Sequence, residues 1–209
     1  MPPRALDTGE GQRVELNKAA SIIHSGGVVA FPTESFYALG VSAWDEKAIQ
    51  RLFAIKKREE NQPLLLLIPT ASLLNQYVIR IPDIASQIME EFWPGGLTLI
   101  FEANPGLPQL LTSGTGKIGL RLSSHPVATA LTRAVGAPIT GTSANISGQT
   151  ACSSAEAVRH SLGRSVDFIL DGGETEGGKG STVLDITVDP PTILREGMVS
   201  REQLEAYLE

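Results

Sequence analysis

The sequence has a single cysteine, Cys152, and three widely separated histidines, His24, His125 and His160. One cysteine excludes an intrachain disulfide and any metal site built from a cysteine cluster, and the histidines lack the spacing of a zinc site. We therefore expect no protein metal site. Aromatic residues make up only 5% of the chain and the formal net charge is -6, which together argue against a dedicated nucleic-acid coat protein.

Long apolar runs are also missing, since no stretch approaches the roughly 20 residues needed to cross a bilayer. Residues 1–11 are polar and lack the charged and then apolar layout of a secretory signal. We therefore expect a cytoplasmic protein without a membrane segment. The 209 residues, 42% of them hydrophobic and 21 of them glycine, fit a globular α/β chain with many tight turns.

The spacing of apolar residues predicts the secondary structure. Helices are expected at residues 16–25, 71–77, 83–92, 126–135 and 154–162, with another starting at 45 and a last one after Ser200, where Gln203 completes a capping-box pattern. Strands are expected at 28–31, 64–68, 97–101, 118–122, 166–170 and 182–188. Because strands and helices interleave, we expect one domain with a mixed or largely parallel sheet and helices on its faces. We assign residues 1–13 to a flexible segment, 14–199 to the domain and 200–209 to a C-terminal helix.

Two segments suggest a nucleotide site when they are taken together. Lys56, Lys57 and Arg58 form a cationic cluster at the predicted end of a helix, and residues 142–145 are the small polar run Thr-Ser-Ala-Asn. Cations neutralise phosphate, and short side chains let a ligand approach the backbone. Taken alone, the cluster is more typical of a solvated helix terminus. Ser143 is better read as a binding residue than as a nucleophile, because no histidine–aspartate partner is evident.

Two arginines stand among apolar residues. Arg121 lies inside a predicted strand and Arg195 follows Ile193 and Leu194. A buried guanidinium needs a partner, which could be an acid such as Glu34 or Asp185, or an anionic ligand.

A glycine-rich loop, residues 173–182, contains a Gly-x4-Gly-Lys pattern. It is not a P-loop, because Gly180 stands where a serine or threonine is required and a strand follows instead of a helix. We interpret the loop as a lid or a hairpin connection, with Ser181 as a candidate ligand contact.

An ordered series of segments resembles the YrdC/TsaC family of L-threonylcarbamoyladenylate synthases over residues 14–197. The segments are 31–40 (FPTESFYALG), 55–58 with 62–64 (IKKR and QPL), 93–98 (WPGGLT), 118–126 (IGLRLSSHP), 142–148 (TSANISG), 180–185 (GSTVLD) and 193–197 (ILREG). The resemblance implies an open, twisted, mixed α/β sheet around a concave basic cavity. It also implies the joining of L-threonine, bicarbonate or CO2, and ATP into threonylcarbamoyl-adenylate, with release of pyrophosphate, for modification of tRNA.

The resemblance also implies roles for individual residues. Lys56 and Arg58 would stabilise the charge of the transition state, and Arg121 would bind the threonine carboxylate. Mg2+ would arrive with ATP and bridge its phosphates with few protein ligands. The residues implied to bind ATP are Lys56, Arg58, Ser143, Asn145, Ser153 and Arg195, and those implied to bind threonine are Thr33, Arg121 and Ser181. Further expected partners are tRNA or double-stranded RNA and the proteins that transfer the threonylcarbamoyl group.

The sequence departs from the family pattern at several positions, which keeps other functions open. They are Ala38, Glu59, Gln62, Gly96, Thr142 and the run 152–154 (Cys-Ser-Ser). One alternative is a YciO-like or HypF-like protein that uses a different amine or carbamoyl donor. Another is a double-stranded RNA-binding module without catalysis. Because the sequence ends at Glu209, we expect it to lack the additional C-terminal domain of longer family members.

Overall fold

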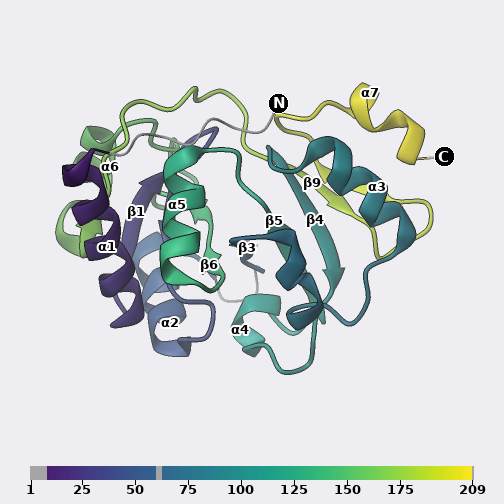
Figure 1. Cartoon of the computed structure of the whole chain (residues 1–209), viewed down its shortest axis with the longest axis horizontal. Coiled ribbons are helices and arrows are strands. Elements are labelled where there is room, and N and C mark those ends of the chain that lie inside the picture. The colour runs from purple at the N-terminus through teal and green to yellow at the C-terminus, as the bar shows by residue number, and fades with distance from the viewer. Residues whose placement is uncertain (1–8, 60–62, 209) are drawn as a thin grey trace.

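A computed structural model describes residues 9–59 and 63–208. Its strands form two mixed sheets (Figure 1). The first sheet has four strands in the order β7-β2-β1-β8, in which β2 is antiparallel to β1 and β7, and β8 is parallel to β1. The bounds of these strands are β1 Val29–Pro32, β2 Tyr37–Gly40, β7 Thr142–Ser143 and β8 Phe168–Ile169. The α/β class is confirmed, and the strands divide between two sheets rather than one.

The four-stranded sheet lies between two layers of helices. Alternate residues of a strand point to opposite faces, so Val29 and Phe31 belong to the cluster that contains α1 and α5, whereas Val28 and Ala30 join the cluster of α2 and α6. Figure 1 shows α1 and α5 side by side at this end of the molecule. The four helices are α1 Glu10–His24, α2 Glu46–Lys56, α5 Pro126–Val135 and α6 Ala155–Leu162.

Local signals set most helix ends. The Asp45 carboxylate accepts from the Ala48 N–H at the start of α2, and the Ser154 hydroxyl accepts from Ala157 N–H at the start of α6. Gly136, in the left-handed conformation, ends α5. α1 begins at Glu10, six residues before the predicted start, and so includes residues 10–13 of the segment assigned as flexible. Residues 1–8 of that segment lie outside the described residues.

The second sheet has six strands in the order β10-β9-β4-β5-β3-β6. Its central strand β4 is parallel to β9 and antiparallel to β5, and β3 is parallel to β5. The bounds are β3 Leu65–Leu67, β4 Leu97–Glu102, β5 Lys117–Arg121, β6 Ile139–Thr140, β9 Thr182–Asp185 and β10 Thr192–Arg195.

Shorter helical elements accompany this sheet. α3 (Asp83–Phe92) places Ala85 and Ile88 in the same buried cluster as Leu97 and Leu99 of β4. The segment Ala71–Gln76 is a 3-10 helix rather than the predicted α-helix, and α4 (Gln109–Thr112) was not predicted. α7 (Arg201–Leu204) begins at Ser200 with the predicted capping box and continues as a 3-10 helix over Glu205–Tyr207.

The two sheets meet where β6 leads into β7. Ser42, just after β2, bridges Ile139 of β6, and the Thr140 N–H donates to the Val41 carbonyl at 3.0 Å. Gly141 lies between the two strands, and a Cβ there would come within 2.8 Å of the Leu67 side chain. A larger residue would therefore require the Leu65 and Leu67 side chains to shift. None of the helices in residues 9–59 and 63–208 combines the length and hydrophobicity of a membrane span.

Candidate functional site

A cavity of about 310 Å³ lies between the two sheets, and the six-stranded sheet supplies one of its walls. Leu97, Leu99, Ile118 and Leu120 point into the buried core, so the alternate positions on β4 and β5 point the other way, into the cavity. These positions are Thr98, Ile100, Gly119 and Arg121. A Cβ on Gly119 would lie 3.2 Å from both the Thr98 and Ile100 side chains, so glycine keeps this wall open.

The opposite wall comes from the turn between β1 and β2 and from β7. Thr33, Ser35, Phe36 and Ser143 line the cavity from this side. The turn is tight, because the N–H and the hydroxyl of Thr33 both donate to the Phe36 carbonyl, at 3.0 and 2.7 Å. The Thr33 hydroxyl is thus held at the edge of the cavity, where it also accepts from the Ser35 N–H at 3.5 Å and keeps one lone pair as an acceptor.

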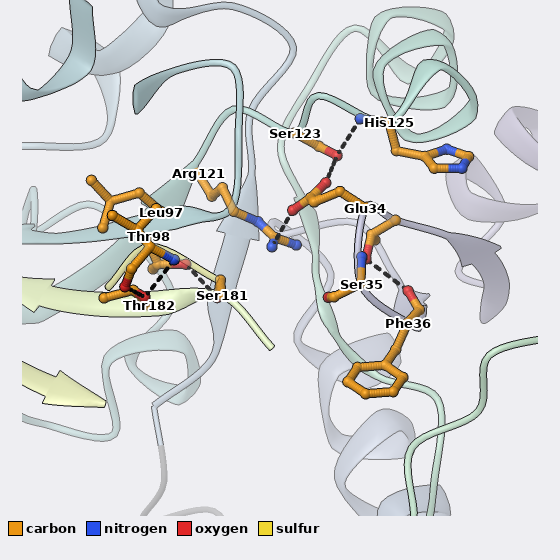
Figure 2. Close-up of polar contacts among 12 residues, drawn as sticks. Glu34, Ser35, Phe36, Leu97, Thr98, Arg121, Ser123, His125, Ser181 and Thr182 are labelled. Carbon is orange, nitrogen blue, oxygen red and sulfur yellow. Dashed lines mark hydrogen bonds and ion pairs between the residues drawn. The ribbon is translucent and has the colours of Figure 1, made fainter. Parts of the chain in front are cut away.

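Arg121 projects from the end of β5 and is only 3% exposed. Its Nη1 lies 2.5 Å from Glu34 Oε1, which makes Glu34 the acidic partner that we considered for a buried arginine. Figure 2 shows the guanidinium between Glu34 on one side and Thr98 and Ser181 on the other. Burial lowers the pKa of Arg121, Glu34 opposes this effect, and the charge of Arg195 adds to the lowering.

Arg195, at the end of β10, is fixed against Ser181. Its Nε and Nη2 donate to the Ser181 carbonyl at 3.1 and 2.8 Å, and Nη2 also lies 3.1 Å from Ser181 Oγ. Ser181 Oγ is in turn 3.0 Å from Thr98 Oγ1. Asp185, the other acid that we considered as a partner, forms its ion pair with Lys117 at 2.9 Å instead.

Arg58 approaches the cavity from just beyond the end of α2. Its Nη1 donates to Thr142 Oγ1 at 3.3 Å and its Nη2 to the Pro63 carbonyl at 2.8 Å. Burial lowers the pKa of Arg58, and the positive charge of Arg195 lowers it further. Arg58, Arg121 and Arg195 therefore converge on one cavity, and every charged residue that lines the described part of it is an arginine. An anionic ligand would relieve their mutual repulsion.

Lys56 does not line the cavity and lies behind Ser143. Lys56 is only 2% exposed. Its ammonium donates to the Ser143 carbonyl, to the Asn145 carbonyl at 2.9 Å and to Asn145 Oδ1 at 3.3 Å. Ser143 Oγ donates to the same Asn145 Oδ1 at 2.6 Å. Burial lowers the pKa of Lys56 to about 8, with a further contribution from the charge of Arg58. Lys56 thus fixes the shape of the 143–145 turn.

The structure places the predicted site residues in two groups. Ser153 lies outside the cavity lining, and its carbonyl accepts from the N–H and hydroxyl of Thr175 at 2.9 and 3.2 Å. Roles in ligand binding remain predictions for all of these residues. Those that line the cavity are Thr33, Arg58, Arg121, Ser143, Ser181 and Arg195, and those that do not are Lys56, Asn145 and Ser153.

The glycine-rich segment crosses from one sheet to the other. It joins β8 of the four-stranded sheet to β9 of the six-stranded sheet, so it is not a hairpin connection. The Gly177 N–H donates to the Ser35 carbonyl and the Tyr37 hydroxyl donates to the Gly173 carbonyl, both at 2.8 Å. Strand β9 follows it directly, as expected for a segment that is not a P-loop.

Several lining residues were not identified from the sequence, among them Phe36, Thr98, Ile100, Gly119 and Leu194. Thr98 and Gly119 could have been identified from the sequence, because both point to the same face of the sheet as Arg121, which is a predicted ligand residue. Gly119 is two residues from Arg121 and therefore points to the same face of β5. Phe36 and Leu194 carry no such signal, because only the tertiary fold brings them to the cavity.

The fold and the cavity define a two-sheet α/β protein with arginines facing one internal site. The chain belongs to the Sua5/YciO/YrdC family, described as "Telomere recombination", whose profile matches residues 21–197. It is 38% identical over 190 residues to the threonylcarbamoyl-AMP synthase of Pyrococcus abyssi, which covers 91% of this chain and 56% of that protein.

Solved structures agree with this assignment. The structure of P. abyssi Sua5 complexed with L-threonine superimposes with a TM-score of 0.89 and is 37% identical, covering 92% of this chain and 57% of that one. YciO from Escherichia coli superimposes with a TM-score of 0.83 at 33% identity, covering 92% of this chain and 93% of that one. The chain spans little more than half the length of the P. abyssi synthase and of the P. abyssi Sua5 chain in that structure.

Proposed function

We propose that this chain is a nucleotidyltransferase that makes threonylcarbamoyl-adenylate from L-threonine, bicarbonate or CO2, and ATP, with release of pyrophosphate. The observation that carries the proposal is the convergence of Arg58, Arg121 and Arg195 on one cavity that also presents small hydroxyl side chains. A triphosphate and a carboxylate are the kinds of ligand that such a cation cluster favours. The similarity to a curated threonylcarbamoyl-AMP synthase and to Sua5 supports the same reaction.

In this proposal the two substrates bind to different residues of the same cavity. Arg58 and Arg195 bind the phosphates of ATP together with Ser143, and Lys56 and Asn145 keep the Ser143 turn in shape. Ser153 is the weakest of the ATP assignments, because only its carbonyl has a described contact. Thr33, Arg121 and Ser181 bind threonine, with Arg121 facing its carboxylate.

The chemistry needs charge stabilisation more than proton transfer. An oxygen of the carbamate group on the threonine nitrogen forms a bond to the α-phosphorus of ATP while the bond from that phosphorus to the leaving pyrophosphate breaks. Negative charge accumulates on the phosphate oxygens as this happens, and fixed guanidinium groups stabilise it without reorganising. We assign no general base, because the carbamate already carries a nucleophilic oxygen.

The lining of the cavity fits a magnesium ion that is carried by ATP. Within the described residues, no group of three or more acidic, histidine or cysteine side chains could hold a metal ion, and the cavity lining includes no carboxylate. Mg2+ prefers phosphate oxygens and water in such sites and supplies further neutralisation of the triphosphate. We therefore propose that Mg2+ binds as part of the substrate.

Pyrophosphate release tests the proposal. The protein is incubated with Mg-ATP and bicarbonate, with threonine present or omitted, and with a panel of other amino acids. Threonine-dependent release supports the proposal, and release with another amine would favour a YciO-like reaction instead. The absence of any amine-dependent release would refute it.

A salt-titrated binding assay with double-stranded RNA tests the non-catalytic alternative. We further propose that the enzyme acts in the cytoplasm and passes its product to proteins that modify tRNA.

A further inference from the structure

A buried carboxylate holds one end of the Arg121 guanidinium. Glu34 has a side chain only 8% exposed, and it is absent from the cavity lining although its neighbours Thr33 and Ser35 belong to it. Its Oε1 forms an ion pair with Arg121 Nη1 at 2.5 Å, although the two groups are not aligned well enough for a hydrogen bond. Glu34 therefore contacts Arg121 from the protein side of the site.

The contact at Nη1 leaves a different edge of the guanidinium for a ligand. The Nε of Arg121 is buried and has no hydrogen-bond partner among the described residues. In any arginine, Nε and Nη2 point the same way and form a fork that fits the two oxygens of a carboxylate. A buried donor without a partner is costly, and a bound carboxylate would satisfy it.

The other oxygen of Glu34 is anchored to a helix. Ser123 Oγ donates to Glu34 Oε2 at 2.5 Å and accepts from the His125 N–H at 3.1 Å, a chain of contacts visible in Figure 2. His125 is the N-cap of α5, where its Nδ1 accepts from the Val127 N–H at 3.2 Å. Glu34 is thus tied to the start of α5 at one oxygen and to β5 at the other. Such anchoring limits the rotamers that Arg121 can adopt.

We propose that Glu34 is a positioning residue for the amino-acid substrate. Its ion pair with Arg121 Nη1 and its hydrogen bond from Ser123 hold the guanidinium in place, so that Nε and Nη2 are left for the carboxylate of that substrate. The inference rests on the proposed function only in naming the carboxylate as that of an amino acid. Glu34 is not itself a ligand or a base in this account, because both of its oxygens already have partners and neither lines the cavity.

Two measurements on Glu34→Gln test the proposal. In the pyrophosphate assay, we expect the KM for threonine to rise about tenfold while the KM for ATP changes less than about twofold, since the variant loosens only the arginine that faces the threonine carboxylate. The NMR signal of the Arg121 Nε–H is assigned as the one that disappears in Arg121→Lys. In Glu34→Gln we expect the order parameter of this Nε–H to fall from about 0.85 to below about 0.6. Glu34→Asp should restore part of both properties.

Control variants separate positioning from general damage. Glu102→Gln removes an exposed carboxylate that pairs with Arg80 at 3.3 Å, and it should change neither readout. Ser123→Ala keeps the ion pair and frees Glu34 Oε2, so it should show the same effects at reduced size, and it carries the test if Glu34→Gln does not fold.

An unchanged Arg121 order parameter, or parallel changes in both KM values, overturns the proposal. Wild-type protein without threonine-dependent pyrophosphate release refutes the proposed function instead, and the NMR result then still decides whether Glu34 positions Arg121.

Discussion

We predict that Lys56 makes the stability and the activity of this protein respond in opposite ways to rising pH. Its pKa in the folded chain is about 8, against an ordinary value of 10.5. At about 1.4 kcal/mol per pH unit, this difference corresponds to roughly 3 kcal/mol of preference for the uncharged amine in the folded state. The cause is burial, because Lys56 is only 2% exposed and its ammonium has lost most of its contact with water.

The direction of the effect on stability follows from proton binding. Below about pH 8 both the folded and the unfolded chain hold the proton on Lys56, so its titration does not change the free energy of unfolding. Between about pH 8 and 10.5 the unfolded chain still holds the proton that the folded chain has released. Stability therefore rises with pH across this window, by about 3 kcal/mol over its full width.

Activity is expected to change the other way. The ammonium donates three hydrogen bonds to oxygens of Ser143 and Asn145, whereas the neutral amine has only two protons to donate. The turn that carries Ser143 then loses one restraint. We expect kcat/KM for ATP to decline above about pH 8 while the protein becomes more resistant to unfolding.

Urea denaturation of wild type and Lys56→Met at several pH values from 7 to 10 isolates this contribution. Both proteins carry Cys152→Ala, which removes the thiol whose charge is coupled to that of Lys56, so the difference between the two free energies of unfolding reports Lys56. We expect this difference to be constant up to about pH 8 and then to shift in favour of wild type. A difference that stays constant to pH 10 would contradict a lowered pKa for Lys56, and a kcat/KM for ATP that is independent of pH across the same range would contradict its role in the Ser143 turn.

Three further predictions concern the cavity and its supports. Arg58→Met and Arg195→Met should each lower kcat/KM for ATP by about 10- to 100-fold, the value of a charged hydrogen bond, and unchanged kinetics would contradict their role. Thr182→Val should lower the free energy of unfolding in urea by about 2 kcal/mol, because the fully buried hydroxyl accepts from Gly197 N–H at 2.8 Å and Val199 N–H at 3.1 Å. Thr192→Val, at an exposed position of β10, is its control and should change stability by less than about 0.5 kcal/mol. Gly197→Ala should destabilise the protein by about 3 kcal/mol or more, since its Cβ would meet the Gly180 carbonyl at 2.1 Å, whereas Gly11→Ala in α1, with open space around it, should not lower the melting temperature.

The sequence predicts helix ends well because their signals are local. Asp45, Ser154 and the Ser200–Gln203 capping box lie next to the helices that they start, and Gly136 next to the one that it ends. Strands are harder, because their pairing is not local. β2 is buried at every position and has no alternation to identify it, and β10 is a short strand at the edge of its sheet. The division into two sheets has no local signal at all.

The site shows the same contrast. Apolar neighbours around Arg121 correctly predicted a buried guanidinium that needs a partner, and Glu34 was one of two acids considered. Choosing between them required the fold, because Asp185 is bound to Lys117. The position of Lys56 could not be predicted either. Its place in the sequence suggested a contact with phosphate, but the end of α2 directs its side chain under the 143–145 turn.

We propose that three converging arginines bind ATP and an amino acid so that an adenylate forms. Radiolabelled bicarbonate tests it most directly, because the label enters an adenylate only if all three substrates meet in the cavity. We expect a labelled adenylate that depends on both threonine and ATP and that is strongly reduced in Arg195→Met. Pyrophosphate release without any labelled adenylate, or equal labelling when threonine is omitted, would contradict the account.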